Sequence, residues 1–186
     1  MNFINWSDWR VAGGKALDLS KIPTLPATHS DTEKMQWPAR MAELAEQLNR
    51  LQVMLYASKK RALLLVLQGM DTSGKDGCIR SVFAHISPLG VRAEAFGVPQ
   101  ALEQKHDFLW RVHAKTPALG EMVIFNRSHY EDVLVPIVQG TIPRSWGEKR
   151  HHHIRHFEAL LHDSGVAVVK CYLHISKQEQ KKRLQA

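Results

Sequence analysis

The residue types best suited to chemistry lie close together between Gly69 and Asp76, where two glycines, a lysine and two carboxylates occur. Gly69, Gly74 and Lys75 match the first seven positions of the phosphate-binding pattern GxxxxGK[ST]. In this pattern the glycines let backbone N–H groups approach phosphate oxygens, and the lysine adds a full charge on a flexible stem. The spacing therefore predicts a phosphate-binding loop.

The eighth position of the pattern departs from it, because Asp76 stands where a Ser or Thr usually holds magnesium. A carboxylate beside bound phosphate is repelled unless a cation lies between them, so Asp71 is a candidate Mg²⁺ ligand, directly or through water. The alternative is a glycine turn in which Asp76 only caps a helix and Lys75 is solvated. The residues expected to contact phosphate are Gly69, Thr72, Ser73, Gly74, Lys75, Asp76, Gly77 and Arg80.

A second polar segment begins at Asn126, directly after the apolar run Met122–Phe125. In the usual second nucleotide motif a carboxylate at this place binds magnesium, whereas Asn126 is neutral and can hold a metal-bound water or a phosphate oxygen. Arg127 offers two parallel hydrogen bonds to phosphate, and Glu131 and Asp132 add negative charge to the segment. The alternative is an ordinary helix pair between Arg127 and Glu131.

Three further groups of polar residues have two interpretations each. Arg111 either pairs with Asp107, four residues earlier, or reaches phosphate. The run His151–His153 has no acidic partner at ligand spacing, which favours a solvated or phosphate-facing helix over a zinc site. A basic face near the end of the chain is either solvated or a lid that closes over phosphates, and it comprises Lys177, Lys181, Lys182 and Arg183. The residues expected to bind nucleotide are Arg111, Asn126, Arg127, Glu131 and Asp132.

The elements that must position these residues alternate between apolar runs and helical patterns, which predicts an α/β fold with a parallel sheet covered on both faces. A buried strand at 63–67 precedes the loop, and further strands are expected at 91–96, 121–126 and 166–175. Helices are expected at about 38–60, from the loop to about residue 86, and at 101–114, 129–139, 145–164 and 177–186. Asp31 or Thr32 could begin the first of these helices. Ligands of such sheets sit beyond the carboxyl ends of the strands.

Composition fits one globular domain of 186 residues with a basic balance, since 25 Lys and Arg outnumber 18 Asp and Glu. A net charge of +7 suits an anionic partner such as a phosphate-rich substrate. Cys78 and Cys171 do not make a disulfide framework and are expected to be buried thiols. No apolar run is long enough for a membrane span and no signal-peptide pattern begins the chain, so a cytoplasmic protein is expected.

Four segments together resemble the polyphosphate kinase 2 family: GMDTSGKDG from Gly69, HDFLWR from His106, IFNRSHYEDVLV from Ile124 and YLHISKQEQKKRL from Tyr172. The Asn-Arg-Ser-His-Tyr-Glu form is similar to the subgroup often called class III, which uses both AMP and ADP. The resemblance implies a three-layer P-loop kinase fold and Mg²⁺-dependent phosphoryl transfer between inorganic polyphosphate and nucleotides.

The same resemblance implies roles for individual residues. Asp71 would place Mg²⁺, Lys75 would steady the transferring phosphoryl group, and Arg127 would bind the acceptor phosphate. Lys181 and Arg183 would belong to the lid and line the polyphosphate path. Family members continue through the rest of the lid and a further strand and helices, so the chain is expected to stop within the lid helix that begins at about residue 176.

The predicted organisation is an N-terminal arm, residues 1–36, followed by a P-loop kinase domain, residues 37–186. The expected partners are polyphosphate and AMP, ADP or ATP, with no nucleic acid and no membrane, in a homo-oligomer. Two other functions stay open: an ATP-dependent nucleoside or nucleotide kinase on the same fold, and a non-catalytic phosphate-binding fragment. Donor preference separates the first two functions, and turnover separates both from the third.

Overall fold

The computed structural model describes residues 9–11, 13, 17–24 and 31–185 of the chain. Its strands are β1 (Ala62–Gly69), β2 (Val91–Ala95), β3 (Met122–Asn126) and β4 (Val166–Leu173). Its α-helices are α2 (Asp31–Ser58), α3 (Lys75–Phe83), α4 (Trp110–His113), α5 (Glu131–Val138), α6 (Arg144–Asp163) and α7 (Lys177–Gln185). Two short 3₁₀ helices, η1 (Leu19–Lys21) and η2 (Glu103–Lys105), complete the set.

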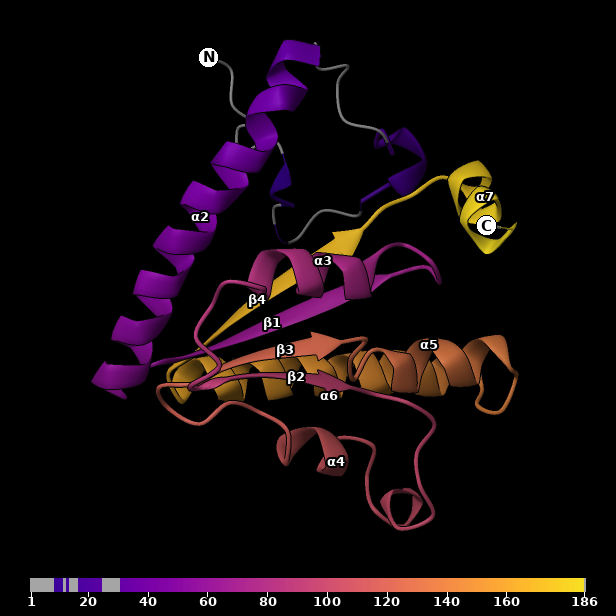
Figure 1. Cartoon of the computed structure of the whole chain (residues 1–186). Helices are drawn as coiled ribbons and strands as arrows, with labels where there is room; N and C mark the ends of the chain where they lie inside the picture. Colours follow the sequence, from indigo (N-terminus) through magenta and orange to yellow (C-terminus); the bar gives the residue numbers. More distant parts are fainter. Residues whose placement is uncertain (1–8, 12, 14–16, 25–30, 186) are drawn as a thin grey trace.

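The four strands form one parallel sheet in the order β2-β3-β1-β4. Leu65 of β1 aligns with Ile124 of β3 on one side and with Val169 of β4 on the other. Helices α2 and α3 lie on one side of the sheet, and α4, α5 and α6 lie on the other (Figure 1). This arrangement confirms the predicted α/β fold, and it brings the carboxyl ends of β1, β2 and β3 to one edge.

The hydrophobic core lies mainly between the sheet and the α4–α6 side. It contains Ala62, Leu64, Val66, Phe96, Val112, Val123, Phe125, Phe157, Leu161 and Val166. All four apolar positions of β3 are buried, whereas β1 alternates between buried and half-buried positions, and Val169 and Tyr172 of edge strand β4 are exposed. The expectation of a sheet fully covered on both faces is therefore met at β3 but not at β4.

The segment predicted as one helix over 101–114 is not a single helix. Only η2 and the short α4 form there, and they are separated because the Asp107 side chain accepts a hydrogen bond from Leu109 N at 2.9 Å. Gln104 turns back in the same way and donates to Pro99 O at 2.9 Å. These side-chain bonds to backbone offer the chain an alternative to helix, which apolar spacing alone does not reveal.

Helix α2 begins at Asp31, one of the two residues that the sequence offered as its possible start, and not near Pro38. The proposed boundary between arm and domain at residues 36 and 37 therefore falls inside a helix, and the division stays a prediction. Half of the arm, residues 1–8, 12, 14–16 and 25–30, lies outside the described residues. No helix of the described part of the chain is long and apolar enough to cross a membrane.

Candidate active site at the carboxyl edge of the sheet

The loop that joins β1 to α3 is shaped by close backbone approaches. A Cβ at Gly69 would lie 2.6 Å from Ser73 Oγ and 2.9 Å from Leu173 O, so only glycine fits there. Gly74 has a φ of 99°, in the left-handed region, and is the N-cap of α3. Thr72 adopts a φ of 63°, a strained value for a residue with a branched Cβ. The loop thus holds its fold at some cost, as binding sites commonly do.

Lys75 points back into the loop and is only 8% exposed. Its Nζ donates hydrogen bonds to Gly69 O at 2.9 Å and Met70 O at 3.1 Å. Burial lowers the pKa of Lys75, and the nearby positive charge of Arg127 adds to that effect. The alternative of a solvated Lys75 is therefore wrong, and the charge sits where phosphate oxygens on the loop would meet it.

Arg127 reaches across the edge of the sheet to the loop. Its Nη2 lies 3.0 Å from Asp71 Oδ1, and both side chains are exposed. The Arg127 backbone has a φ of 62°, and its N–H donates to Leu67 O at 3.2 Å. Because α5 begins only at Glu131, the alternative helix pair between Arg127 and Glu131 is not formed. The ion pair instead joins the β1 loop to the β3 loop.

A second link between the two loops is the hydrogen bond from the Asn126 amide to the Asp76 carboxylate. Asp76 therefore does more than cap α3, whose N-cap makes no side-chain hydrogen bond. These links surround a hollow of about 380 Å³. It is lined by Asp71, Thr72, Ser73, Gly74, Lys75, Asp76, Gly77, Ala95, Phe96, Gly97, Asn126 and Arg127. Two residues expected to contact phosphate do not line this hollow: Gly69 is the last residue of β1, and Arg80 is exposed farther along α3.

A larger hollow of about 570 Å³ adjoins the first one and shares Asp71 and Arg127 with it. Its remaining walls come from β1, β4 and α5, and Glu131, Leu134, Lys170 and Tyr172 are among them. Glu131, one of the predicted nucleotide-binding residues, therefore faces this hollow rather than the one that Lys75 lines.

Helix α7 lies next to the loop that joins β1 to α3 (Figure 1). Gln180 donates to Asp71 O at 3.1 Å, and Arg183 donates to Thr72 O at 3.1 Å. Arg183 is oriented by Glu179, whose Oε1 lies 2.7 Å from its Nε. Lys181 lies on another side of α7, in a hollow of about 380 Å³ that it shares with Gln178, Lys182 and Gln185. The structure thus brings Arg183 to the site, while Lys181 stands beside it.

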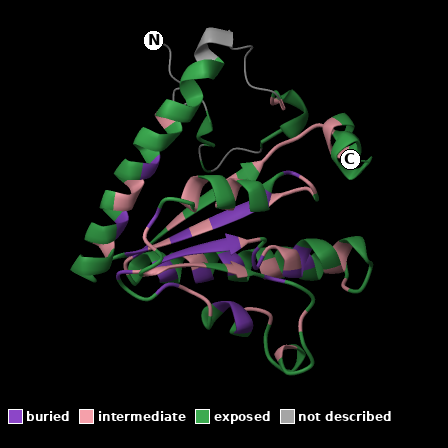
Figure 2. Cartoon of the chain, in the orientation of Figure 1, coloured by how far each residue is buried: buried purple, intermediate pink, exposed green. Residues whose placement is uncertain are grey.

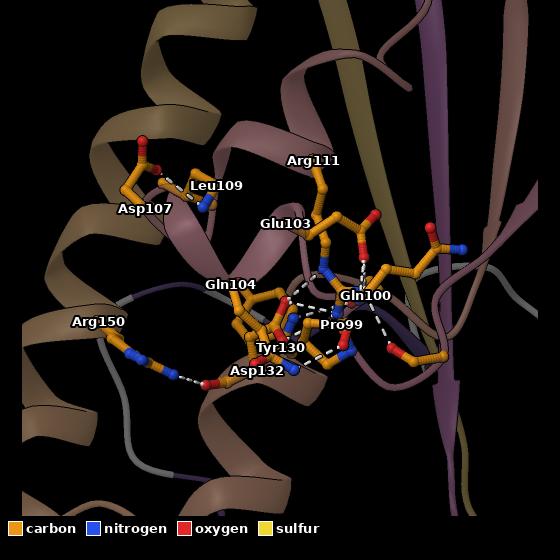
Figure 3. Close-up of polar contacts among 12 residues, drawn as sticks. Pro99, Gln100, Glu103, Gln104, Asp107, Leu109, Arg111, Tyr130, Asp132 and Arg150 are labelled. Carbon is orange, nitrogen blue, oxygen red and sulfur yellow. Dashed lines mark hydrogen bonds and ion pairs between the residues drawn. The ribbon is translucent and has the colours of Figure 1, made fainter.

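Arg111 and Asp132 form a buried ion pair behind the site (Figure 3). Nη2 of Arg111 lies 2.9 Å from both carboxylate oxygens, and the two side chains are 6% and 8% exposed. Nη1 of Arg111 also donates to Gly97 O at 3.0 Å, which ties the β2 loop to α5. Burial raises the pKa of Asp132 against the opposing effect of Arg111. The alternative pairing of Arg111 with Asp107 is wrong, and both predicted nucleotide residues support the hollow from behind.

A polar cluster under α5 was not expected from the sequence. Glu158 of α6 accepts hydrogen bonds from Tyr130 Oη at 3.0 Å and Lys170 Nζ at 2.6 Å, and it contacts His129 at 3.4 Å. Burial alone would raise the pKa of Glu158, but the hydrogen bonds from these three residues lower it to about 2. The cluster anchors the segment after Arg127 to the sheet. Its members come from three elements, so no local pattern could have indicated it.

The donor set around the first hollow fits a hard divalent cation. Asp71 and Asp76 supply carboxylate oxygens and Asn126 an amide, which are the ligand types that Mg²⁺ prefers. Within the described residues no group of three or more His, Cys, Asp and Glu side chains could hold a metal ion. A cation here would therefore complete its shell with phosphate oxygens and water, as Mg²⁺ does in phosphoryl-transfer sites.

Comparison with known proteins agrees with this geometry. Residues 31–186 match the family model described as polyphosphate kinase 2. The chain belongs to the polyphosphate kinase 2 family. The AMP/ADP-polyphosphate phosphotransferase of Meiothermus ruber is 52% identical to it over 145 residues, which are 78% of this chain and 54% of that relative. The ADP-polyphosphate phosphotransferase of Rhodopseudomonas palustris is 39% identical over 195 aligned positions, covering 98% of this chain and 67% of that relative.

A solved structure of the same family is similar in fold. Polyphosphate kinase 2 from Arthrobacter aurescens TC1 superposes with a TM-score of 0.87 at 38% sequence identity. The superposition covers 96% of this chain and 64% of that one. This family member therefore spans about half to two thirds of the length of these relatives.

Proposed function

We propose that this chain carries the phosphoryl-transfer site of a kinase that moves phosphoryl groups between inorganic polyphosphate and AMP or ADP. The observation that supports it most directly is the convergence of Lys75, Asp71 and Arg127 on one hollow of about 380 Å³. Membership of the polyphosphate kinase 2 family supports the substrate class. Relatives named as AMP/ADP- and ADP-polyphosphate phosphotransferases support the acceptors.

In this proposal, Lys75 and the backbone N–H groups of the loop hold the transferring phosphoryl group. Lys75 is held by two backbone carbonyls, so its charge is fixed before substrate arrives. A preorganised charge of this kind stabilises the negative charge on the equatorial oxygens of a transferring phosphoryl group. Gly74 is the N-cap of α3, so the N-terminal end of that helix, which favours anions, borders the hollow.

In the same proposal, Arg127 binds the phosphate of the acceptor nucleotide. The Arg127 guanidinium pairs with Asp71, so acceptor phosphate would compete with that carboxylate for Arg127. Mg²⁺ would be held by Asp71 together with the phosphates, and it would neutralise charge on the donor and orient the transferring group. Arg183 of α7 would add a further cation from the other side of the loop.

The test is nucleotide chromatography after the chain is incubated with AMP or ADP, long-chain polyphosphate and Mg²⁺. Lys75→Met is expected to lower product formation about a hundredfold or more, the usual effect of losing a preorganised charge. Lys149→Met, an exposed lysine on α6 that does not line the hollow, is the matched control and should leave the rate unchanged.

Substitution of ATP for polyphosphate distinguishes the donor. Product from ATP but not from polyphosphate would replace the proposal by an ATP-dependent kinase. Salt-sensitive binding of polyphosphate without turnover, in this chain and in a version extended to the length of its relatives, would leave a phosphate-binding protein without activity.

A further inference from the structure

The segment between β3 and α5 holds Arg127 in a backbone conformation that needs support. The chain passes there from the buried strand β3 into α5 (Figure 2), and Arg127 has a φ of 62°, in the left-handed region. That region is unfavourable for a residue with a Cβ, and it persists only where the surrounding structure fixes the chain. The direction of the Arg127 side chain therefore depends on how the residues that follow it are held.

The two residues directly after Arg127 are fully buried and held by their side chains. The Oγ of Ser128 accepts hydrogen bonds from Gln68 Nε2 at 3.1 Å and from Tyr130 N at 3.2 Å, which ties the segment to the end of β1. His129 lies edge-on to aromatic rings of β3 and α6. Packing alone fixes the place of the His129 ring, whereas its rotation depends on polar partners.

Glu158 of α6 is the residue on which the polar contacts of the segment converge. Its Oε1 accepts a hydrogen bond from Tyr130 Oη at 3.0 Å and lies 3.4 Å from His129 Nε2. Its Oε2 accepts a hydrogen bond from Lys170 Nζ at 2.6 Å, and Lys170 also donates to Tyr130 Oη at 3.1 Å. Because the Glu158 side chain is only 13% exposed, water screens these bonds little. One carboxylate thus connects two consecutive residues of the segment to α6 and β4.

The other ring nitrogen of His129 makes this dependence on Glu158 stronger. His129 Nδ1 is buried and has no hydrogen-bond partner among the described residues. A proton on Nδ1 would be buried without an acceptor, so the favoured tautomer carries the proton on Nε2, where Glu158 accepts it. Removal of the carboxylate would leave both ring nitrogens of His129 without a partner.

We infer that Glu158 is a positioning residue for the acceptor nucleotide: it fixes His129 and Tyr130, and through them the direction of Arg127. Glu158 lines neither of the two adjoining hollows, whereas Arg127 lines both. The inference rests on the proposed role of Arg127 at the acceptor phosphate. Two parallel hydrogen bonds to phosphate need a defined orientation of the guanidinium, and a misplacement of ~1 Å by a distant substitution can cost up to about a hundredfold in rate.

The test is isothermal titration calorimetry of the full chain in Mg²⁺ with AMP and, separately, with long-chain polyphosphate. Glu158→Ala should raise the dissociation constant for AMP about tenfold and change that for polyphosphate less than about twofold. A general loss of folded protein would instead weaken both ligands together. Glu158→Gln keeps the shape of the side chain and an acceptor for Tyr130 but loses the charge that binds Lys170. It should weaken AMP binding measurably, though less than Glu158→Ala.

Arg127→Met shows whether Glu158 acts through Arg127. In that background, adding Glu158→Ala should raise the dissociation constant for AMP by less than about twofold, because the group to be positioned is gone. Glu121→Ala is the matched control. Glu121 accepts a hydrogen bond from Ala118 N at 3.0 Å and pairs with Arg92 at 3.5 Å, but it lies at the other end of β3 and lines neither hollow. Its variant should bind AMP like the wild type.

Far-UV circular dichroism identifies a variant that does not fold, and if Glu158→Ala is one, Glu158→Gln decides. Equal affinity of the wild type and the Glu158 variants for AMP would overturn the inference and leave the proposed function standing. So would a further loss of about tenfold when Glu158→Ala is added to Arg127→Met, since Glu158 would then act independently of Arg127. A wild type that binds polyphosphate but not AMP would overturn the proposed function and the inference together.

Discussion

The buried pair of Arg111 and Asp132 allows a quantitative test of how the site is supported. Arg111→Met keeps the length of the side chain and removes its charge, which leaves the Asp132 carboxylate, 8% exposed, without its partner. Breaking a buried pair from one side typically costs about 3–5 kcal/mol. We expect a loss in this range in the free energy of unfolding, measured by urea titration with far-UV circular dichroism.

The double variant Arg111→Met with Asp132→Leu distinguishes the effect of an unpaired buried charge from the effect of lost packing. It removes both charges together, and apolar replacement of a whole buried pair is often close to neutral. We expect the double variant to be less destabilised than Arg111→Met, to within about 2 kcal/mol of the wild type. The hydrogen bond to Gly97 O stays lost, so anion binding at the hollow should remain weaker in both variants.

An ion pair that is partly exposed to water provides the control. Lys115 lies 2.6 Å from Glu94, and the two side chains are 34% and 22% exposed. Because water screens such a pair, Lys115→Met should cost no more than about 1 kcal/mol. A loss for Arg111→Met as small as that of Lys115→Met would refute the structural role given to Arg111.

The pH dependence of the Arg111→Met variant gives an independent check. Burial raises the folded-state pKa of Asp132 above its ordinary 3.8, and without Arg111 only the smaller effect of the Arg150 charge opposes it. A carboxyl with a raised folded pKa stabilises the fold fully below its unfolded pKa and loses that contribution as pH rises through the folded pKa. The difference in free energy of unfolding between the wild type and Arg111→Met should therefore shrink as pH falls toward 3.8. A difference that does not change with pH would contradict the pairing of Arg111 with Asp132.

Three further predictions follow from single contacts. Glu158→Gln removes a carboxylate whose pKa is lowered from 4.5 to about 2. As pH falls from 4.5 toward 2, the wild type should therefore lose roughly 2–3 kcal/mol more of its free energy of unfolding than the variant. An equal pH dependence of the two proteins in urea titrations would contradict this. Gly69→Ala places a Cβ 2.9 Å from Leu173 O and should cost about 1–3 kcal/mol in the same assay, whereas Gly77→Ala, with open space around its Cβ, should cost less. Arg127→Lys keeps the charge but loses the planar fork, so steady-state kinetics should show about a tenfold higher KM for AMP; an unchanged KM would remove Arg127 from the acceptor site.

The sequence determined those parts of the site that depend on neighbours along the chain. The loop from Gly69 to Lys75 follows from the spacing of its glycines, because the backbone conformation of a tight turn is set within a few residues. The apolar runs around Leu65 and Ile124 gave the parallel strands, since a strand buried on both faces has no polar positions. The expected helix at 101–114 failed for a local reason too, namely that Asp107 and Gln104 bind backbone groups.

Only the tertiary structure decided which charged groups meet. Asn126 bonds to Asp76 and Arg127 to Asp71 because β3 lies beside β1, an order that no local pattern specifies. Arg111 had a plausible partner four residues away, yet burial beside α5 pairs it with Asp132 instead. Charged side chains reach far and pair in several ways, so their partners are selected by the packing of whole elements, whereas turns and strands are selected by the residues within them.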